Sequence, residues 1–307
     1  MQIAIIGMGS MGPGMAARLA RGGHDVRAQD IAPTAIERAQ TIQPMISEAL
    51  DGLGVADQGG VIVYHEAIEA IEAAVAGADL VIENVPEKIE IKAQVYAGLD
   101  RLIGAETLVA SDTSGIPITQ LQAHISHPER FIGMHWSNPP HIIPMIEVIA
   151  GDATSQATVK SIQDLIRSLD LLPVTLKRDV PGFVENRVLY ALLRECVDLV
   201  EQGVIDSEDL DTCVKWGIGY KLSVVGPMRL LDMAGLDIYQ SVASFLNAEL
   251  CDRSDVSPMV TKATDQGKLG MKTGAGLFEY SPDDLAALPR ERGAKLVAVR
   301  RVLEGNA

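Results

Sequence analysis

The feature that most constrains the fold is a glycine-rich turn near the start of the chain, Gly7-Met8-Gly9-Ser10-Met11-Gly12. It follows a short apolar run, Ile3 to Ile6, and opens a helical pattern predicted from Met11 to Leu19. Glycines at these spacings allow a tight turn, a close approach of the backbone to a pyrophosphate and close packing of the helix. The helix N-terminus would attract the pyrophosphate charge. We therefore expect a dinucleotide to bind at Gly7, Gly9, Ser10, Met11 and Gly12.

Asp30 indicates which dinucleotide binds. It follows the second predicted strand, Asp25 to Gln29, and comes 23 residues after Gly7. A carboxylate at this place can accept a hydrogen bond from a ribose 2′-hydroxyl and repels a 2′-phosphate. The strand before the turn, the helix after it and this acid agree with one another, so we expect NAD rather than NADP.

Short β-branched runs alternate with helical patterns through the first half of the chain, which predicts an α/β fold with a parallel sheet. Pro144 to Ile149 would add an antiparallel strand. The remaining predicted strands are Leu80 to Glu83, Thr107 to Ala110, Phe131 to His135 and Pro173 to Leu176.

Near Pro181-Gly182 the pattern changes to apolar residues at helical spacing, first over Asn186 to Glu201. A further helix is predicted over Glu208 to Val214, with Ser207 as its N-cap. The sequence thus predicts an NAD-binding Rossmann domain over residues 1–182. We expect residues 183–307 to form an all-α C-terminal domain that contributes to substrate binding and dimerisation.

The composition excludes several other classes of protein. A formal net charge of −15 should repel nucleic acid and anionic lipid. No apolar stretch is long enough to cross a bilayer, and the N-terminal segment lacks the basic leader of a signal peptide. Three scattered cysteines make neither a disulfide framework nor a metal knuckle, and for His124 and His127 a solvated loop is favoured over a metal site. We expect a cytoplasmic protein without a metal.

His135 and Glu147 are candidates for acid–base chemistry. His135 ends the apolar run from Phe131, and Glu147 follows it by twelve residues, inside Met145 to Ile149. A base for alcohol oxidation needs a pKa near the working pH, and an imidazole held by a carboxylate meets that need in one tautomer. On spacing alone, a histidine satisfied at a strand end and a solvated acid at a strand edge explain the two residues equally well. Beside a nicotinamide site, the pair predicts a dehydrogenase.

The order and spacing of several motifs resemble the 3-hydroxyacyl-CoA dehydrogenase family over nearly the whole chain. The resemblance implies a Rossmann domain followed by a helical, dimer-forming domain. The motifs are Asp112-Thr113-Ser114, Gly133 to Pro139, Ile146 to Ile149, Pro181 to Arg187 and Lys268 to Gly276.

The same resemblance implies roles for individual residues. His135 would be the base and Glu147 would orient it, while Ser114 and Asn186 would hold the substrate oxygen or the catalytic geometry. Four more residues would lie near the cofactor: Glu87, Lys92, Asn138 and Lys272. Without the resemblance, a solvated surface charge would be the preferred explanation for each of the two lysines.

Departures from the family bear on the substrate. Between Ile31 and Glu87 the chain has no lysine and a single arginine, Arg38, among many acids, and such a surface should bind the phosphates of CoA poorly. A long segment, Gly219 to Arg229, replaces the family's short glycine-proline turn. It could supply Lys221 or Arg229 to a substrate carboxylate, and solvent exposure is an equally good explanation of both residues.

A narrower resemblance, over Ser111 to Thr119, His135 to Pro144 and Gly219 to Arg229, is to a branch of this family that oxidises a pyridine aldehyde with NAD. It implies a small anionic aromatic aldehyde as the substrate, which Trp136 could help to enclose. All three cysteines lie in the second domain, so a thiohemiacetal route lacks its nucleophile. We expect His135 to deprotonate the aldehyde hydrate instead, with dismutation as a further activity.

Two other functions stay open at this point. One is an L-3-hydroxyacyl-CoA dehydrogenase, or a dehydrogenase of another 3-hydroxy acid. The other is a non-enzymatic NAD-binding protein, against which the intact set of His135, Glu147, Ser114 and Asn186 argues.

Overall fold

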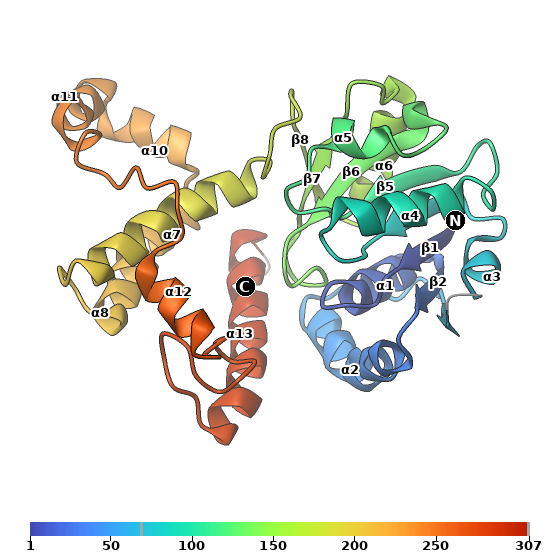
Figure 1. The fold of residues 1–307 in the computed structure, drawn as a ribbon, viewed down its shortest axis with the longest axis horizontal. Helices are drawn as coiled ribbons and strands as arrows, with labels where there is room; N and C mark the ends of the chain where they lie inside the picture. The colour runs from blue at the N-terminus through green and yellow to red at the C-terminus, as the bar shows by residue number, and fades with distance from the viewer. Residues whose placement is uncertain (68–69, 306–307) are drawn as a thin grey trace. The chain divides into compact units, whose positions relative to one another are not determined.

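The computed structural model describes residues 1–67 and 70–305 and divides the chain into two compact units, Met1–Asn186 and Arg187–Ala307 (Figure 1). The first unit is built of alternating strands and helices, and the second of helices. The α/β fold class with a helical C-terminal part is therefore confirmed. None of the described helices is long and apolar enough to span a membrane.

An eight-stranded sheet, in the order β3-β2-β1-β4-β5-β6-β7-β8, forms the centre of the first unit (Figure 1). The first six strands of the chain are parallel to one another, whereas β7 pairs antiparallel with β6, and β8 pairs parallel with β7. The strands are β1 (Gln2–Ile6), β2 (Asp25–Asp30), β3 (Ile62–Glu66), β4 (Leu80–Glu83), β5 (Leu108–Ser111), β6 (Phe131–Trp136), β7 (Met145–Ile149) and β8 (Leu172–Thr175).

Every predicted strand is present, with ends displaced by at most one residue. The expectation of a parallel sheet is wrong for β8, which runs opposite to the first six strands. The short connection from β6 to β7 reverses the chain, and the helical crossover that follows returns it parallel to β7. The sequence pattern also misses β3, because this edge strand is only half-buried and shows no clean alternation of buried and exposed residues.

Helices cover both faces of the sheet. On one face, α1 (Gly12–Arg21), α2 (Pro33–Gly52) and α6 (Gln156–Ser168) pack on side chains such as Ile3 and Ile5. On the other face, α3 (Ile71–Val75), α4 (Ile89–Leu99) and α5 (Ile118–Gln122) share a core with Ala4 and Ile6. Successive residues of β1 thus serve opposite cores, as the period of a buried strand requires.

The division between the two units falls inside the long helix α7 (Glu185–Glu201). Its first two residues belong to the first unit, and the rest belong to the second. The predicted N-cap Ser207 is wrong. Asp206 caps α8 (Ser207–Thr212), because its backbone is extended and its carboxylate accepts a hydrogen bond from Asp209 N at 2.9 Å. The other segments are the π-helical η3 (Cys213–Gly219), α9 (Tyr220–Leu222), α10 (Pro227–Ala234), α11 (Leu236–Leu246), α12 (Pro258–Asp265) and α13 (Pro282–Leu303).

Candidate active site

The glycine-rich turn joins β1 to α1 and has the shape that a pyrophosphate needs. Gly7 has φ +104°, and a Cβ atom there would lie 2.4 Å from Asn84 O, so only glycine fits. A side chain at Gly9 would meet no described atom within 4 Å, which leaves room for a ligand beside the turn. Met11, the N-cap of α1, makes no side-chain cap, and the first turn of α1 carries no acid. The N–H groups there are left for an anion.

Asp30 lies against this turn at the end of β2. Its Oδ2 atom accepts a hydrogen bond from Met8 N at 2.7 Å, and its Oδ1 atom accepts one from Ala32 N at 2.8 Å. Each oxygen keeps a lone pair with which a ribose hydroxyl could bond. The exposed Arg38, on α2, donates to Met8 O at 3.3 Å and was given no cofactor role in the sequence analysis. The turn, the helix N-terminus and the acid fit NAD.

His135 and Glu147 face each other across the antiparallel pair β6–β7, in direct register. The reversal between these strands brings together residues twelve apart in the chain. The Nδ1 atom of His135 lies 2.8 Å from Glu147 Oε2. Both side chains are buried, at 6 % and 1 % exposure, so a solvated acid no longer explains Glu147. Its Oε1 atom accepts hydrogen bonds from Val184 N at 2.9 Å and Glu185 N at 3.1 Å, at the start of α7.

The environment shifts the pKa values of both groups toward the ion pair. Burial alone would lower the pKa of His135, but the hydrogen bond to Glu147 and the charges of nearby carboxylates outweigh it and raise that pKa. Burial would raise the pKa of Glu147, but its hydrogen bonds to His135 and to the two backbone N–H groups lower it. The imidazole is therefore more basic than an isolated one.

Asp112 is a buried acid that the sequence analysis did not single out for itself. Its Oδ1 atom accepts a hydrogen bond from Trp136 N at 2.8 Å, next to His135 in β6. Burial raises the pKa of Asp112 to about 7, against the opposing effects of that hydrogen bond and of His135. A carboxyl group that titrates near neutral pH thus lies beside the imidazole.

The structure also brings Ser114 and Asn186 together. Asn186 Nδ2 donates to Ser114 O at 2.7 Å, although the two residues are 72 positions apart. Glu87 holds the same segment, because its Oε1 atom accepts hydrogen bonds from Thr113 Oγ1 at 2.6 Å and from Ser114 N at 2.9 Å. Hydrogen bonds from this segment and the charge of Lys92 lower the pKa of Glu87, although its burial acts in the opposite direction. Glu87 therefore positions the Ser114 segment.

Lys92 lies in the interior, at 1 % exposure, and is not a solvated surface charge. Its Nζ atom lies 2.7 Å from Glu83 Oε1 and 3.4 Å from Glu87 Oε2. Tyr96 and Ser111 donate to the other oxygen of Glu83, which completes a buried polar network. Lys92 thus helps to position Glu87. The nearness of Lys92 to the cofactor stays a prediction.

Two further side chains lie near His135: Phe183, which precedes α7, and Glu185, the first residue of α7. Phe183 is fully buried, and its ring centroid lies 5.6 Å from that of the imidazole. Glu185 accepts a hydrogen bond from Ser137 Oγ at 2.6 Å. His135, Glu147 and Glu185 form the one group of three possible metal ligands found among the described residues. No sequence signal marked Glu185, because a glutamate at a predicted helix start is common.

The remaining predicted positions are exposed side chains. Asn138 is exposed just after β6, and Lys272 is exposed in the second unit, in a turn that Gly270 closes by donating to Ala275 O. His127 is half exposed and pairs with Glu129 at 3.3 Å.

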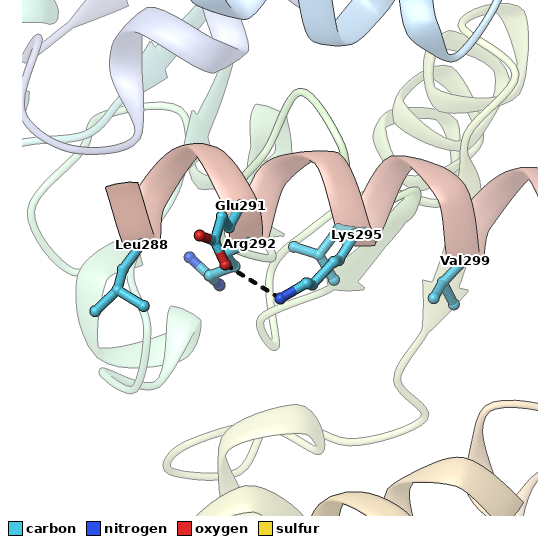
Figure 2. A pocket seen from close by; sticks show the side chains of 6 residues that line it. Leu288, Glu291, Arg292, Lys295 and Val299 are labelled. Atoms are coloured by element: carbon cyan, nitrogen blue, oxygen red, sulfur yellow. Dashed lines mark hydrogen bonds and ion pairs between the residues drawn. The ribbon is translucent and has the colours of Figure 1, made fainter. Parts of the chain in front are cut away.

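A hollow in the second unit lies along α13, where Leu288, Leu296 and Val299 form most of its lining with Arg292 (Figure 2). Its polar feature is an exposed pair between Glu291 and Lys295, one helical turn apart, with an N–O distance of 3.3 Å. Long side chains of a single helix carry no convergent set of catalytic groups, so this hollow is not the candidate active site.

Comparison with family models places both parts of the chain. Residues 2–180 match the model of the 3-hydroxyacyl-CoA dehydrogenase NAD binding domain, and residues 182–280 match that of the 3-hydroxyacyl-CoA dehydrogenase C-terminal domain. The chain belongs to the 3-hydroxyacyl-CoA dehydrogenase family. It is an NAD-dependent dehydrogenase, as the sequence analysis expected.

Individual relatives differ in what they act on. The chain is 67% identical over 304 residues to the 5-formyl-3-hydroxy-2-methylpyridine 4-carboxylate 5-dehydrogenase of Mesorhizobium japonicum, covering 99% of this chain and 98% of that protein. A crystal structure of such an enzyme, described as an NAD⁺-dependent dismutase, has a TM-score of 0.96 at 66% identity and 99% coverage of both chains. A probable 3-hydroxybutyryl-CoA dehydrogenase of Bacillus subtilis is 33% identical over 282 residues, which are 91% of this chain and 97% of that protein. The narrower resemblance to a pyridine-aldehyde enzyme is thus confirmed as a resemblance.

Proposed function

We propose that this enzyme oxidises 5-formyl-3-hydroxy-2-methylpyridine-4-carboxylate to the 4,5-dicarboxylate with NAD, and that it also dismutes the aldehyde. The observation that carries the proposal is the buried His135–Glu147 pair in a chain that is 67% identical to an enzyme of that name. The pair supplies a base, and the relative supplies the substrate class.

The hydrogen bonds around His135 support its role as the base. Glu147 Oε2 accepts from Nδ1–H, so Nε2 is the nitrogen left to take a proton from the substrate. NAD held at the glycine-rich turn would supply the acceptor for the hydride released from the substrate carbon. Glu147, held by two backbone N–H groups, keeps the ring in one orientation and stabilises the imidazolium that forms. Ser114 and Asn186 would hold the substrate oxygen.

An aldehyde must gain an oxygen atom to become an acid, and a hydrate route provides it from water. A thiohemiacetal route would need a cysteine at the site. Cys196, Cys213 and Cys251 all belong to the second unit, and none neighbours His135 in the chain. We therefore assign oxidation to the aldehyde hydrate, and dismutation follows when a second, unhydrated aldehyde is reduced.

The substrate carboxylate needs a positive partner, and we propose Lys221 or Arg229. Lys221 lies in α9 and Arg229 in α10, and both are exposed in the chain, where a ligand could reach them. The acidic stretch from Ile31 to Glu87 offers little to CoA phosphates, which favours the small aldehyde over a hydroxyacyl-CoA.

We further propose a homodimer in the cytoplasm. Helix α7 has no buried residue and exposes Val188, Tyr190 and Leu193, at 63 %, 68 % and 44 %. Large apolar side chains gathered on one helix are typical of a protein interface. Sedimentation equilibrium should give twice the chain mass, and a monomer at micromolar concentration would contradict this assignment.

Steady-state assays test the substrate. Purified enzyme should turn over the pyridine aldehyde with NAD, and chromatography should detect both the dicarboxylate and the alcohol. The matched assay offers 3-hydroxybutyryl-CoA with NAD under the same conditions. Efficient turnover of the thioester with none of the aldehyde would replace our proposal with an ordinary hydroxyacyl-CoA dehydrogenase.

A further inference from the structure

Glu185 carries a carboxylate oxygen that the fold leaves unsatisfied. Its Oε1 atom accepts a hydrogen bond from Ser137 Oγ, whereas its Oε2 atom is buried and has no hydrogen-bond partner among the described residues. Such an oxygen has lost its water without gaining a donor, which is unfavourable. A donor that arrives with a ligand would remove this cost.

The unsatisfied carboxylate lies beside the catalytic pair. A ring nitrogen or carboxylate oxygen of each of three residues lies within 4.8 Å of the other two; the residues are His135, Glu147 and Glu185. The two oxygens of Glu147 are already bonded to His135 and to the start of α7. Between these two carboxylates, Glu185 has the oxygen that accepts no hydrogen bond from the described residues, so it has the greater remaining capacity to accept a new one.

The hydrate of an aldehyde needs one more acceptor than an alcohol does. An alcohol presents one hydroxyl, whose proton the base removes. A hydrate presents two hydroxyls on the same carbon, and His135 can take the proton of only one. The second hydroxyl requires an acceptor close to the imidazole, and an ionised carboxylate is the strongest that a protein offers.

We propose that Glu185 is a catalytic residue that accepts a hydrogen bond from the second hydroxyl of the aldehyde hydrate. This inference rests on the proposed aldehyde oxidation. In the step, the C–H bond breaks and its electron pair and hydrogen pass to NAD, while His135 takes one hydroxyl proton and the C=O bond forms. The hydroxyl bonded to Glu185 becomes the OH of the carboxylic acid and afterwards loses its proton to water.

The role makes Glu185 specific for one half of the dismutation. Reduction acts on the unhydrated aldehyde, which has no second hydroxyl for Glu185 to bind. A residue that acted only through His135 would affect oxidation and reduction alike, because the same imidazole exchanges the proton in both. The ratio of the two activities therefore separates the two roles.

The test compares Glu185→Gln with a matched control, Glu106→Gln, which removes an exposed carboxylate of the same unit. The acid and the alcohol formed with excess NAD or NADH are quantified by chromatography. Since a charge-assisted hydrogen bond is about twice as strong as a neutral one, we expect the ratio of kcat/KM for oxidation to kcat/KM for reduction to fall about tenfold. The control should leave the ratio unchanged.

A binding measurement gives a second readout. The dicarboxylate product would place its new carboxylate against Glu185, and like charges repel. With NADH bound, calorimetry should therefore show that Glu185→Gln binds the dicarboxylate several-fold more tightly than the wild type does. If that variant does not fold, Ser137→Ala tests the same contact, because it removes the hydroxyl that holds Oε1 and should lower the ratio in the same direction.

The outcomes are distinct. An equal loss of both activities, or an unchanged ratio with unchanged product affinity, would overturn the role of Glu185 and leave the proposed function intact. Failure of the wild type to convert the aldehyde in either direction would remove the proposed function and this inference with it.

Discussion

Replacing Glu147 by glutamine should reverse the tautomer of His135. Two backbone N–H groups, of Val184 and Glu185, hold the Oε1 atom of Glu147, so the carbonyl oxygen of the glutamine will take that place. Its NH₂ group then faces Nδ1 of His135, where the carboxylate oxygen lies at 2.8 Å. An NH₂ group can only donate, so Nδ1 must accept and the ring proton moves to Nε2. Nε2 can then no longer act as a base.

The expected loss follows from this reversal. General-base catalysis contributes about 10²–10⁴-fold, and reversing the tautomer in a Ser-His-Asp triad lowers kcat by about 10⁴-fold. We therefore expect Glu147→Gln to lower kcat for the aldehyde by at least about 10²-fold. NAD affinity, measured by fluorescence titration, should be unchanged, because Glu147 lies in β7 and not at the glycine-rich turn.

The pH profile supplies the second test. Oxidation needs the neutral imidazole, so the rate should rise with pH through the raised pKa of His135. Glu147→Gln removes a hydrogen bond and a charge that raise this pKa, so the residual activity should appear at lower pH. General-base catalysis contributes at least about 10²-fold, so a variant that keeps more than about a tenth of wild-type kcat would refute the reasoning. An acidic limb at its original pH would do so as well.

The remaining predictions concern the base, the cofactor and the buried network. His135→Ala should abolish turnover and leave NAD affinity nearly unchanged, as activity and titration will show. Asp30→Ala should narrow the preference for NAD over NADP, because it removes repulsion of a 2′-phosphate. Adding Arg38→Ala should restore part of that preference, because it removes the neighbouring cation. Equal use of both cofactors by the wild type would contradict the role of Asp30. Lys92→Met leaves a buried carboxylate unpaired and should cost about 3–5 kcal/mol in urea unfolding, whereas Lys160→Met, in an exposed pair, should cost far less.

Local patterns suffice to predict the nucleotide-binding half of the fold. The turn from Gly7 to Gly12 and the acid at the end of β2 are close in sequence to the elements that they join, so their geometry follows from residue type and spacing. Buried strands such as β4 are continuous apolar runs, and the sequence shows them directly. The half-exposed β3 has no such pattern, and only its pairing with β2 makes it a strand.

The site depends on contacts between segments that are distant in the chain. The twelve-residue spacing of His135 and Glu147 permits pairing, but the antiparallel register of β6 and β7 decides it. Asn186 reaches Ser114 and Glu185 reaches Ser137 only because the chain turns back at Phe183, whose φ of +51° is unusual for a bulky residue. The residue types of His135 and Glu147 predicted that pair. No local pattern could predict the turn at Phe183.

The net charge of the site is the property that is hardest to predict from the sequence. Counting acids would give Asp112, Glu147 and Glu185 one negative charge each, and an anionic substrate would be repelled by all three. Burial instead raises the pKa of Asp112 to about 7, so this group is partly protonated near neutral pH, while hydrogen bonds lower the pKa of Glu147 and keep it ionised to balance the imidazolium. Lower pH thus weakens the repulsion of the substrate, and higher pH keeps His135 neutral. Binding and proton removal therefore place opposite demands on pH, and both act within one cluster of side chains.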